Sequence, residues 1–127
     1  MLLIKTKIGP SSIHGIGLFA DQFIAKGTPI WEFTEGFDIK VSEKDLEKLS
    51  KHAREWFYQY AYLNPQSNQY VLCCDNARFY NHSENPNTSC VDFQEEEGTD
   101  VAAKDIQMGE ELTIDYLTFD AKSLTEI

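Results

Sequence analysis

Turn-forming and charged residues recur through this chain every few residues, and they constrain its fold more than any other feature. Short runs rich in β-branched and aromatic residues are repeatedly bounded by Gly, Pro, Asn, Asp or charged residues, a pattern typical of short strands. No internal repeat or low-complexity linker divides these runs. We therefore predict a mainly β domain, with strands at residues 2–7, 17–20, 28–33, 70–74, 88–93, 100–103 and 112–114.

One segment, around residues 42–63, departs from this pattern. Its apolar residues recur at helical spacing, Ser42 and Asp45 resemble a capping box, and Asn64 with Pro65 supplies a stop. The pattern predicts one helical insert. Aromatic side chains spread over more than one face of this helix, so they either pack against the sheets or line a cleft for a ligand. They are Trp56, Phe57, Tyr58, Tyr60 and Tyr62.

The size and charge of the chain narrow the classes of function. At 127 residues, of which 42% are hydrophobic, the chain has the length of one domain, which we place at residues 1–127. A formal net charge of −10 argues against a nucleic-acid-binding protein, which needs a basic face, and favours a basic partner. The acidic run at residues 95–97 is expected to be a solvated hairpin tip, with guidance of a basic substrate as the alternative.

The cysteines and the first residues of the chain indicate the cellular compartment of the protein. Three cysteines cannot all pair within one chain, and Cys73 and Cys74 are adjacent and poorly placed to bridge each other. The apolar run at the N-terminus is broken by Lys5 and Lys7, and it is too short for a signal peptide or a membrane span. We expect an intracellular protein of the reducing cytoplasm or nucleus, without membrane contact.

Two motifs combine residues that bind ligands with residues that form turns. HGIGLFA, at residues 14–20, places a glycine pair where the backbone can approach a ligand closely. It lacks the third glycine of a dinucleotide site and the Gly-Lys-Ser/Thr of a phosphate loop, and a tight turn is the alternative. RFYNHSENPN, at residues 78–87, is rich in Asn, Ser and Pro, which by themselves favour an irregular loop.

A third motif, GEELTIDY at residues 109–116, predicts a turn at Gly109 that feeds a strand ending on Asp115 and Tyr116. Alone it could be a hairpin with a capping tyrosine. In this order and spacing, however, the three motifs resemble the SET domain of protein lysine methyltransferases. The resemblance covers about residues 3–117 and leaves a short tail, residues 118–127.

The resemblance implies a mainly β (α+β) fold of several small sheets with one helical insert. Its C-terminal segment would thread beneath the loop that carries Asn81 and so form a pseudoknot. The cofactor would be S-adenosyl-L-methionine, and the acceptor a lysine side chain of a protein or peptide, with a histone tail among the candidates. The cofactor-binding residues implied are Gly15, Gly17, Leu18, Arg78, Asn81, His82 and Tyr116.

Tyr116 is also the catalytic residue that the resemblance implies. A lysine must lose its proton before it can accept a methyl group, at a cost of about 4–5 kcal/mol at pH 7. The Tyr116 hydroxyl would orient the neutral amine rather than act as a bulk base. Tyr80 and one of Tyr58, Tyr60 or Tyr62 would complete the walls of the lysine channel, and we take Tyr60 and Tyr62 as the candidates.

The tail departs from the pattern of many relatives. It contains no cysteine, so we predict no metal site, and Phe119 is its sole aromatic residue. The channel is then closed by Phe119, by another subunit, by the substrate, or not at all. Two hypotheses follow: a homodimer that covers the aromatic surface, and a non-catalytic binding or regulatory module that keeps the fold without a complete lysine channel.

Overall fold

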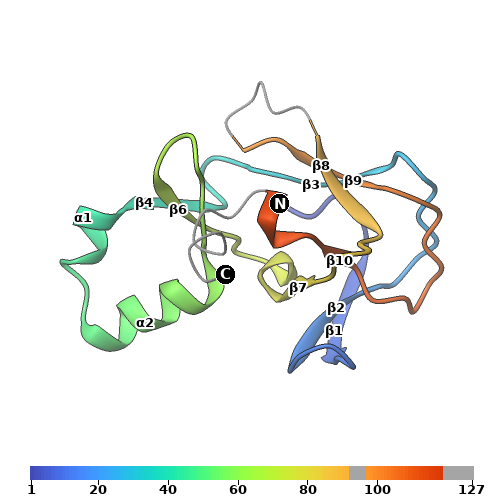
Figure 1. Cartoon of the computed structure of the whole chain (residues 1–127), viewed down its shortest axis with the longest axis horizontal. Coiled ribbons are helices and arrows are strands. Elements are labelled where there is room, and N and C mark those ends of the chain that lie inside the picture. The colour runs from blue at the N-terminus through green and yellow to red at the C-terminus, as the bar shows by residue number, and fades with distance from the viewer. Residues whose placement is uncertain (92–96, 119–127) are drawn as a thin grey trace.

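The computed structural model describes residues 1–91 and 97–118 and consists mainly of short strands (Figure 1). The strands are β1 (Thr6–Pro10), β2 (Ile16–Ala20), β3 (Pro29–Glu32), β4 (Ile39–Ser42), β5 (Tyr62–Leu63), β6 (Gln69–Leu72), β7 (Asn81–His82), β8 (Thr88–Val91), β9 (Thr99–Ala102) and β10 (Thr113–Ile114). The helices are α1 (Glu43–Leu46), α2 (Lys51–Tyr60) and two 3₁₀ turns, η1 (Asn76–Phe79) and η2 (Tyr116–Thr118). The prediction of a mainly β fold is confirmed.

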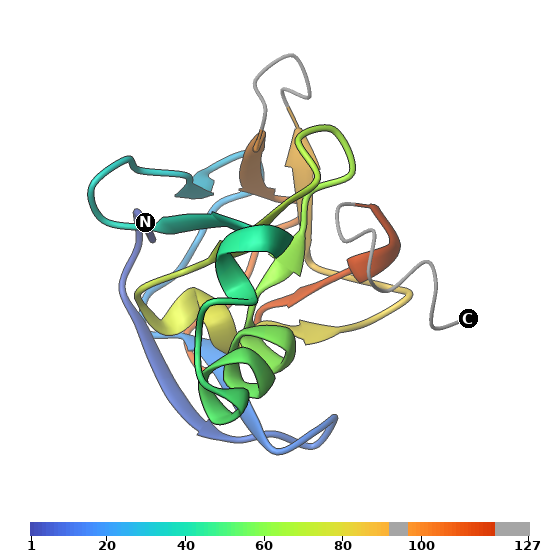
Figure 2. The same cartoon turned by 90° about the vertical axis from the view of Figure 1, so that its left-hand side faces the viewer.

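The described strands form small separate sheets. β1 and β2 make an antiparallel hairpin, two three-stranded sheets have the orders β3-β9-β8 and β4-β6-β5, and β7 pairs with β10 in parallel. Figure 1 shows α1 and α2 at one end of the molecule beside β4 and β6, with β7 and β10 between them and the β1–β2 hairpin. Figure 2, seen from that end, shows both helices in front of the strands.

Each predicted strand overlaps an observed strand, but the strand predicted at residues 2–7 begins only at Thr6, and Leu2 makes an isolated bridge to Trp31. Residues 92 and 93 of the predicted strand 88–93 lie outside the described residues. β4, β5 and β7 were not predicted. Strands of two to four residues carry little pattern of their own, and these three depend on their partners.

The predicted single helix is two helices. Ser42 caps α1 as expected, because its Oγ accepts a hydrogen bond from the Asp45 N–H at 3.1 Å. Ser50 then caps α2 by accepting from the Ala53 N–H at 3.2 Å. A serine side chain that binds the backbone favours a helix start over a helix interior. The apolar residues keep their helical spacing across Ser50, but the helix itself is interrupted there and starts again at Lys51.

The core has two parts. The larger cluster joins β2, β3 and β9 to the segment that leads into β10, and its fully buried side chains include Leu18, Ile24, Ile30, Ile106 and Leu112. The smaller cluster, formed by Leu46, Ala61, Tyr70 and Leu72, holds the helical end against β6. The larger cluster thus packs the C-terminal strand region against the β1–β2 hairpin.

The C-terminal segment runs between β2 and β7. On one side the Leu112 N–H donates to the Leu18 carbonyl at 2.7 Å, and the Ala20 N–H donates to the Glu110 carbonyl at 2.9 Å. On the other side β10 pairs with β7, and the Ser83 N–H donates to the Ile114 carbonyl at 3.1 Å. The C-terminal segment is therefore held between β2, near the start of the chain, and β7, in its second half, as the predicted pseudoknot requires.

The side chain of Asn87 secures this crossing. Its Nδ2 donates to the Glu111 carbonyl at 2.8 Å, and its Oδ1 accepts from the Thr113 N–H at 2.9 Å. The neighbouring Thr88 hydroxyl donates to the Thr113 carbonyl at 2.7 Å. Asn87 and Thr88 are both buried, so water cannot replace these bonds.

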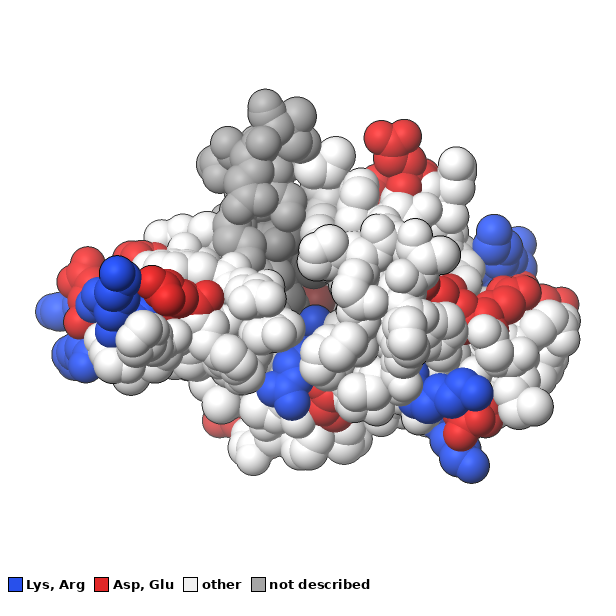
Figure 3. Space-filling model, turned by 90° about the horizontal axis from the view of Figure 1, so that it is seen from below, with Lys and Arg blue, Asp and Glu red and all other residues white. Residues whose placement is uncertain are grey.

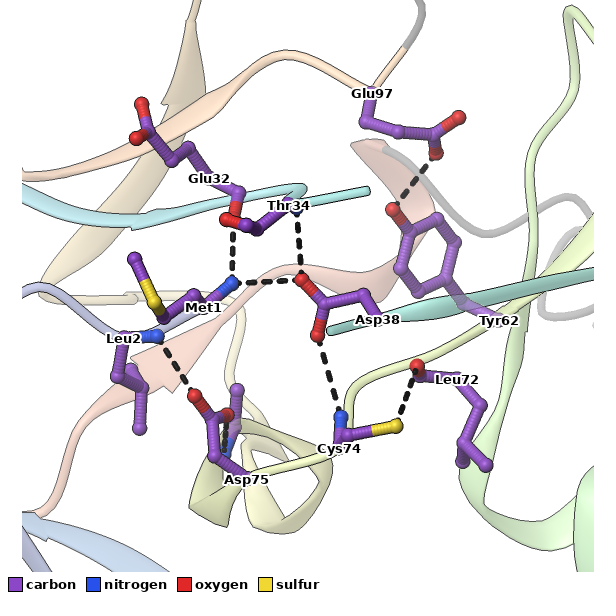
Figure 4. A network of polar contacts seen from close by, with 11 residues as sticks. Met1, Leu2, Glu32, Thr34, Asp38, Tyr62, Leu72, Cys74, Asp75 and Glu97 are labelled. Carbon is purple, nitrogen blue, oxygen red and sulfur yellow. Dashed lines mark hydrogen bonds and ion pairs between the residues drawn. The ribbon is translucent and has the colours of Figure 1, made fainter. Parts of the chain in front are cut away.

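Asp38 is buried among hydrogen-bond donors (Figure 4). Its carboxylate pairs with the amino group of Met1 at 2.8 Å and accepts from the N–H groups of Thr34, at 2.9 Å, and Cys74, at 3.2 Å. The Met1 amino group also donates to the Glu32 carbonyl. These bonds compensate the carboxylate for lost hydration, and they join the first residues to the chain around β3, β4 and β6.

Asp100, on β9, lies in a different environment. It is buried opposite Cys90 of β8, whose thiol is its hydrogen-bonding neighbour. Burial raises the pKa of the Asp100 carboxyl to about 7, and the thiol offsets only part of that effect. Folding therefore favours the protonated carboxyl.

None of the three cysteines forms a disulfide within the described residues, and Cys73 is buried. Burial raises the pKa of the Cys73 thiol well above its ordinary value, so this side chain is a protonated, apolar part of the core. Within residues 1–91 and 97–118, none of the helices has the length and apolar character needed to cross a membrane.

The crossing generates a stability prediction. Replacing Asn87 with Ala should lower the free energy of unfolding by about 2–3 kcal/mol, because the Glu111 carbonyl and the Thr113 N–H lose their buried partner. Urea unfolding followed by circular dichroism measures this. Asn85→Ala is the matched control, since Asn85 is exposed in the same segment. Equal losses in the two variants would contradict the role of Asn87.

Asp100 generates a pH prediction. The stabilisation that this carboxyl contributes is complete below about pH 4, its unfolded range, and is lost as pH rises through the folded value of about 7. Asp100→Asn should therefore raise the free energy of unfolding near pH 8 by up to about 4 kcal/mol. Urea unfolding from about pH 5 to pH 8 should show stability that falls more steeply with pH in the unmutated chain. Parallel profiles would rule the effect out.

Candidate functional site

The glycine-containing turn between β1 and β2 forms one side of the site. Gly15 has a φ of +46°, which favours glycine, and a side chain there would have no atom within 4 Å. The Ser11 N–H donates to the Gly15 carbonyl at 2.8 Å, and the Ser11 Oγ accepts from the Ile13 N–H at 2.9 Å. The turn is thus held from inside while its outer surface at Gly15 stays open.

Asn81, at the start of β7, lies against this turn. Its Nδ2 donates to the His14 carbonyl at 3.0 Å, the Ile16 carbonyl at 3.4 Å and the Glu111 Oε2 at 2.9 Å. All three partners only accept hydrogen bonds, so the amide can be oriented in one way. The Asn81 Oδ1 consequently points away from them, and no donor among the described residues bonds to it.

Tyr116 is held by the residues on either side of Asn81. Its N–H donates to the His82 Nδ1 at 3.1 Å, its ring lies 5.4 Å from the His82 ring, and its hydroxyl donates to the Tyr80 carbonyl. Because the His82 Nδ1 accepts, the neutral ring carries its proton on Nε2. The tyrosine is therefore fixed at its backbone and at its hydroxyl.

Arg78 lies on η1, which packs against β1 and β2. Its guanidinium lies over the rings of Trp56 and Phe79, at 5.6 and 5.5 Å from their centroids. The Arg78 Nε is buried and has no hydrogen-bond partner within the part of the chain that the structure describes. A buried donor without a partner is costly, which makes this nitrogen a candidate for an acceptor group on a ligand.

Seen from below, the molecule is hollowed between the α1–α2 end and the β1–β2 hairpin (Figure 3). Acidic and basic side chains both lie in and beside this hollow, and both are also found on the helical end.

The tyrosines predicted to line a channel differ in their surroundings. Tyr80 lies in the core, only 8% exposed, and burial raises the pKa of its phenol well above the ordinary value. The Tyr62 hydroxyl donates to Glu97 Oε1 at 2.8 Å, and burial followed by the Glu97 charge raises its pKa (Figure 4). Both phenols therefore stay protonated and cannot serve as bases.

The other predicted wall residues lie further along the helical insert and the tail. The Tyr60 ring lies 5.3 Å from the Trp56 ring and 6.0 Å from the Phe79 ring, the two rings that the Arg78 guanidinium also contacts. Tyr58 is exposed, and its hydroxyl donates to Glu43 at 2.6 Å. Phe119 lies outside the described residues.

The prediction of a solvated acidic tip is wrong for Glu97. Its side chain is only 4% exposed and pairs with the Lys40 ammonium at 2.8 Å. It also accepts hydrogen bonds from the Tyr62 hydroxyl and the Asn64 amide, both at 2.8 Å. The run of like charges suggested a solvated segment because the sequence does not reveal these distant partners. Residues 95 and 96 lie outside the described part.

The structure also shows which predicted cofactor residues meet. The glycine turn contacts Asn81 and Tyr116 contacts His82, so these residues meet at β7. Arg78 lies on η1, which precedes β7 in the chain. The Leu18 side chain is buried, and its carbonyl is already bonded to the Leu112 N–H. No group of three His, Cys, Asp or Glu side chains able to hold a metal ion occurs within residues 1–91 and 97–118.

Sequence reasoning missed three residues here. Glu111 and Ser11, whose side chains meet at 2.7 Å, lie 100 positions apart, so no local pattern joins them. Trp56 was predicted only as one of a group of helix aromatics, and its contact with Arg78 depends on how α2 docks. Glu111 does stand within the third motif, which was the only available signal.

Comparison with known proteins agrees with the geometry. The sequence profile described as SET domain matches residues 15–117. A Plasmodium falciparum (isolate 3D7) protein, provisionally named histone-lysine N-methyltransferase 1, is 27% identical over 117 residues. That match covers 89% of this chain, and the chain spans only 2% of the length of that relative.

Solved structures share the fold. A crystal structure of a Plasmodium falciparum protein, provisionally described as a histone methyltransferase, has a TM-score of 0.63 at 23% identity, over 91% of this chain and 95% of that one. Polycomb Repressive Complex 2 of Chaetomium thermophilum gives 0.69 at 24% identity, over 97% and 17% of the two chains. The same complex bound to S-adenosylmethionine gives 0.67 at 23% identity, also over 97% and 17%. With a family profile that spans most of its length and a fold that matches, this chain belongs to the SET domain family.

Proposed function

We propose that this domain transfers a methyl group from S-adenosyl-L-methionine to a lysine side chain of a protein substrate. The observation that carries the proposal is the meeting of the glycine turn, Asn81, His82 and Tyr116 where β7 pairs with β10. The names of the relatives support lysine as the acceptor, and the complex solved with S-adenosylmethionine supports the cofactor.

The residues at the site fit this cofactor. Gly15 leaves open space at the turn, the Asn81 Oδ1 is available to accept from an ammonium group, and the buried Arg78 Nε is available to donate to a carboxylate. We propose that these groups bind the cofactor, together with the backbone at Gly17 and Leu18 and the side chains of His82 and Tyr116. When bound, S-adenosylmethionine supplies a methyl group activated by its sulfonium.

Tyr116 is the residue that we propose to orient the lysine. Its hydroxyl donates to the Tyr80 carbonyl, so its proton is engaged and its oxygen lone pairs can accept a hydrogen bond from the amine. Its backbone is held by His82, which leaves the side chain little freedom. Fixed geometry of this kind lowers the entropic part of the barrier.

The amine must be neutral to react. Deprotonating a free lysine at pH 7 costs about 4–5 kcal/mol. A channel that excludes water and a nearby positive charge both lower the lysine pKa. The protonated phenols of Tyr62 and Tyr80 suit the walls of such a channel, since they add no negative charge that would favour the ammonium form. We propose Tyr60 and Phe119 as further wall residues.

The substrate that we propose is a basic protein segment, with a histone tail as one candidate. A formal net charge of −10 attracts such a segment over long range. Dimerisation stays a hypothesis. A non-catalytic module that binds the cofactor is the competing outcome of the experiments below.

Cofactor binding is the first test. Isothermal titration with S-adenosylmethionine should show binding by the unmutated chain, and Asn81→Ala should weaken it by roughly tenfold or more, because an ammonium loses a charge-assisted acceptor. Asn85→Ala is the control, because Asn85 is exposed. Circular dichroism checks that each variant is folded. An unmutated chain that binds no cofactor would overturn the proposal.

Turnover is the second test. Tyr116→Phe should lower production of S-adenosylhomocysteine from basic peptides by roughly 100-fold, because the hydroxyl acts on the amine. Cofactor affinity should change much less, since phenylalanine keeps the ring that we propose to contact the cofactor. Tyr58→Phe removes an exposed hydroxyl bonded to Glu43 and should leave the rate unchanged. Cofactor binding without turnover by the unmutated chain, across a screen of lysine peptides, would favour the non-catalytic module.

A further inference from the structure

We propose that Glu111 is a positioning residue that holds the glycine turn and the Asn81 amide in their binding geometry, an inference that rests on the proposed function. Glu111 was not among the residues that the sequence indicated. Its carboxylate lies between the Ser11–Gly17 turn and Asn81, so a single side chain contacts two parts of the proposed cofactor site.

The contacts of the carboxylate connect distant segments. The Ser11 hydroxyl donates to Glu111 Oε1 at 2.7 Å and lies 2.9 Å from Oε2, while the Asn81 Nδ2 donates to Oε2 at 2.9 Å. Ser11 in turn accepts from the backbone of Ile13 and His14. The carboxylate therefore orders the turn through Ser11 and the amide directly.

The backbone of Glu111 is fixed independently of its side chain. Its carbonyl accepts from the Asn87 amide at 2.8 Å, and it bridges Phe19 of β2. The side chain thus extends from a point that belongs to the crossing of the C-terminal segment. Its removal should disturb the turn and the amide while leaving the crossing bonds in place.

Gly17 provides the space for this carboxylate. A Cβ at Gly17 would lie 2.5 Å from Glu111 Oε2 and 2.8 Å from its Cδ, closer than atoms can approach. Gly9, paired with Gly17 across the hairpin, has only an ordinary contact at 3.8 Å. The two facing glycines therefore differ: a Cβ at Gly17 would displace the Glu111 carboxylate, whereas Gly9 has room for a methyl group.

The orientation of Asn81 gives the carboxylate its effect on binding. Glu111 is a charged acceptor for the Asn81 amide, and charge-assisted bonds are stronger than those to the two carbonyls. Without the Glu111 carboxylate, the Asn81 amide loses its strongest acceptor. Only the His14 and Ile16 carbonyls then hold Nδ2 inward and Oδ1 outward. A merely structural residue would change stability and leave the affinity of the folded protein intact.

The test measures S-adenosylmethionine affinity by titration calorimetry, at a temperature where circular dichroism shows each variant folded. Glu111→Ala should weaken binding by roughly tenfold or more, and Glu111→Gln, which keeps one acceptor oxygen, should fall between it and the unmutated chain. Glu110→Gln, at an exposed neighbour, should bind like the unmutated chain. In nitrogen-15 spectra without cofactor, the Asn81 side-chain resonances should shift in both Glu111 variants.

The glycine pair supplies a second, independent comparison. Gly17→Ala should displace the carboxylate and weaken binding as Glu111→Ala does, while Gly9→Ala should not. Unchanged affinity in folded Glu111→Ala would overturn the assignment, and so would equal effects of the two glycine substitutions. If Glu111→Ala does not fold, Glu111→Gln and the glycine pair decide by the same criteria. Failure of the unmutated chain to bind would instead overturn the proposed function and this assignment with it.

Discussion

The passage of the C-terminal segment between β2 and β7 is the constraint on which the rest of the structure depends. Leu112 bonds to β2 on one side, β10 pairs with β7 on the other, and Asn87 supplies a donor and an acceptor to the same segment. A side-chain amide can replace part of a neighbouring strand because it carries the same two groups as a peptide bond. Local structure alone would not keep strands this short in place.

The candidate site is a direct product of that crossing. β7 holds the C-terminal strand and also carries Asn81 and His82, while Tyr116 follows the strand that β7 holds. The bonds that stabilise the crossing are therefore also the bonds that set the geometry of the site. Side chains held by such a shared framework keep their orientation before a ligand arrives, which reduces the entropy lost on binding.

Buried carboxylates connect the small sheets in addition to the hydrophobic clusters. Asp38 joins the first residue to the chain around β3, β4 and β6, and Glu97 joins Lys40 of β4 to Tyr62 of β5. Each is satisfied by several donors, which offsets the cost of removing it from water. Asp100 is less well compensated, and its raised pKa reflects the cost that remains.

The sequence by itself determined the fold class, most strands, the caps at Ser42 and the motifs that identify the family, because turn chemistry and side-chain period act over a few residues. The helix start at Ser50 is a local cap that the apolar periodicity across it concealed. The sequence could not show that β7 is a strand, because β7 exists through its pairing with the distant β10. The tertiary structure alone decided that Glu97 is buried and that Glu111 meets Ser11 and Asn81. Contacts across 30 to 100 positions leave no local pattern, since only the folded chain brings those groups together.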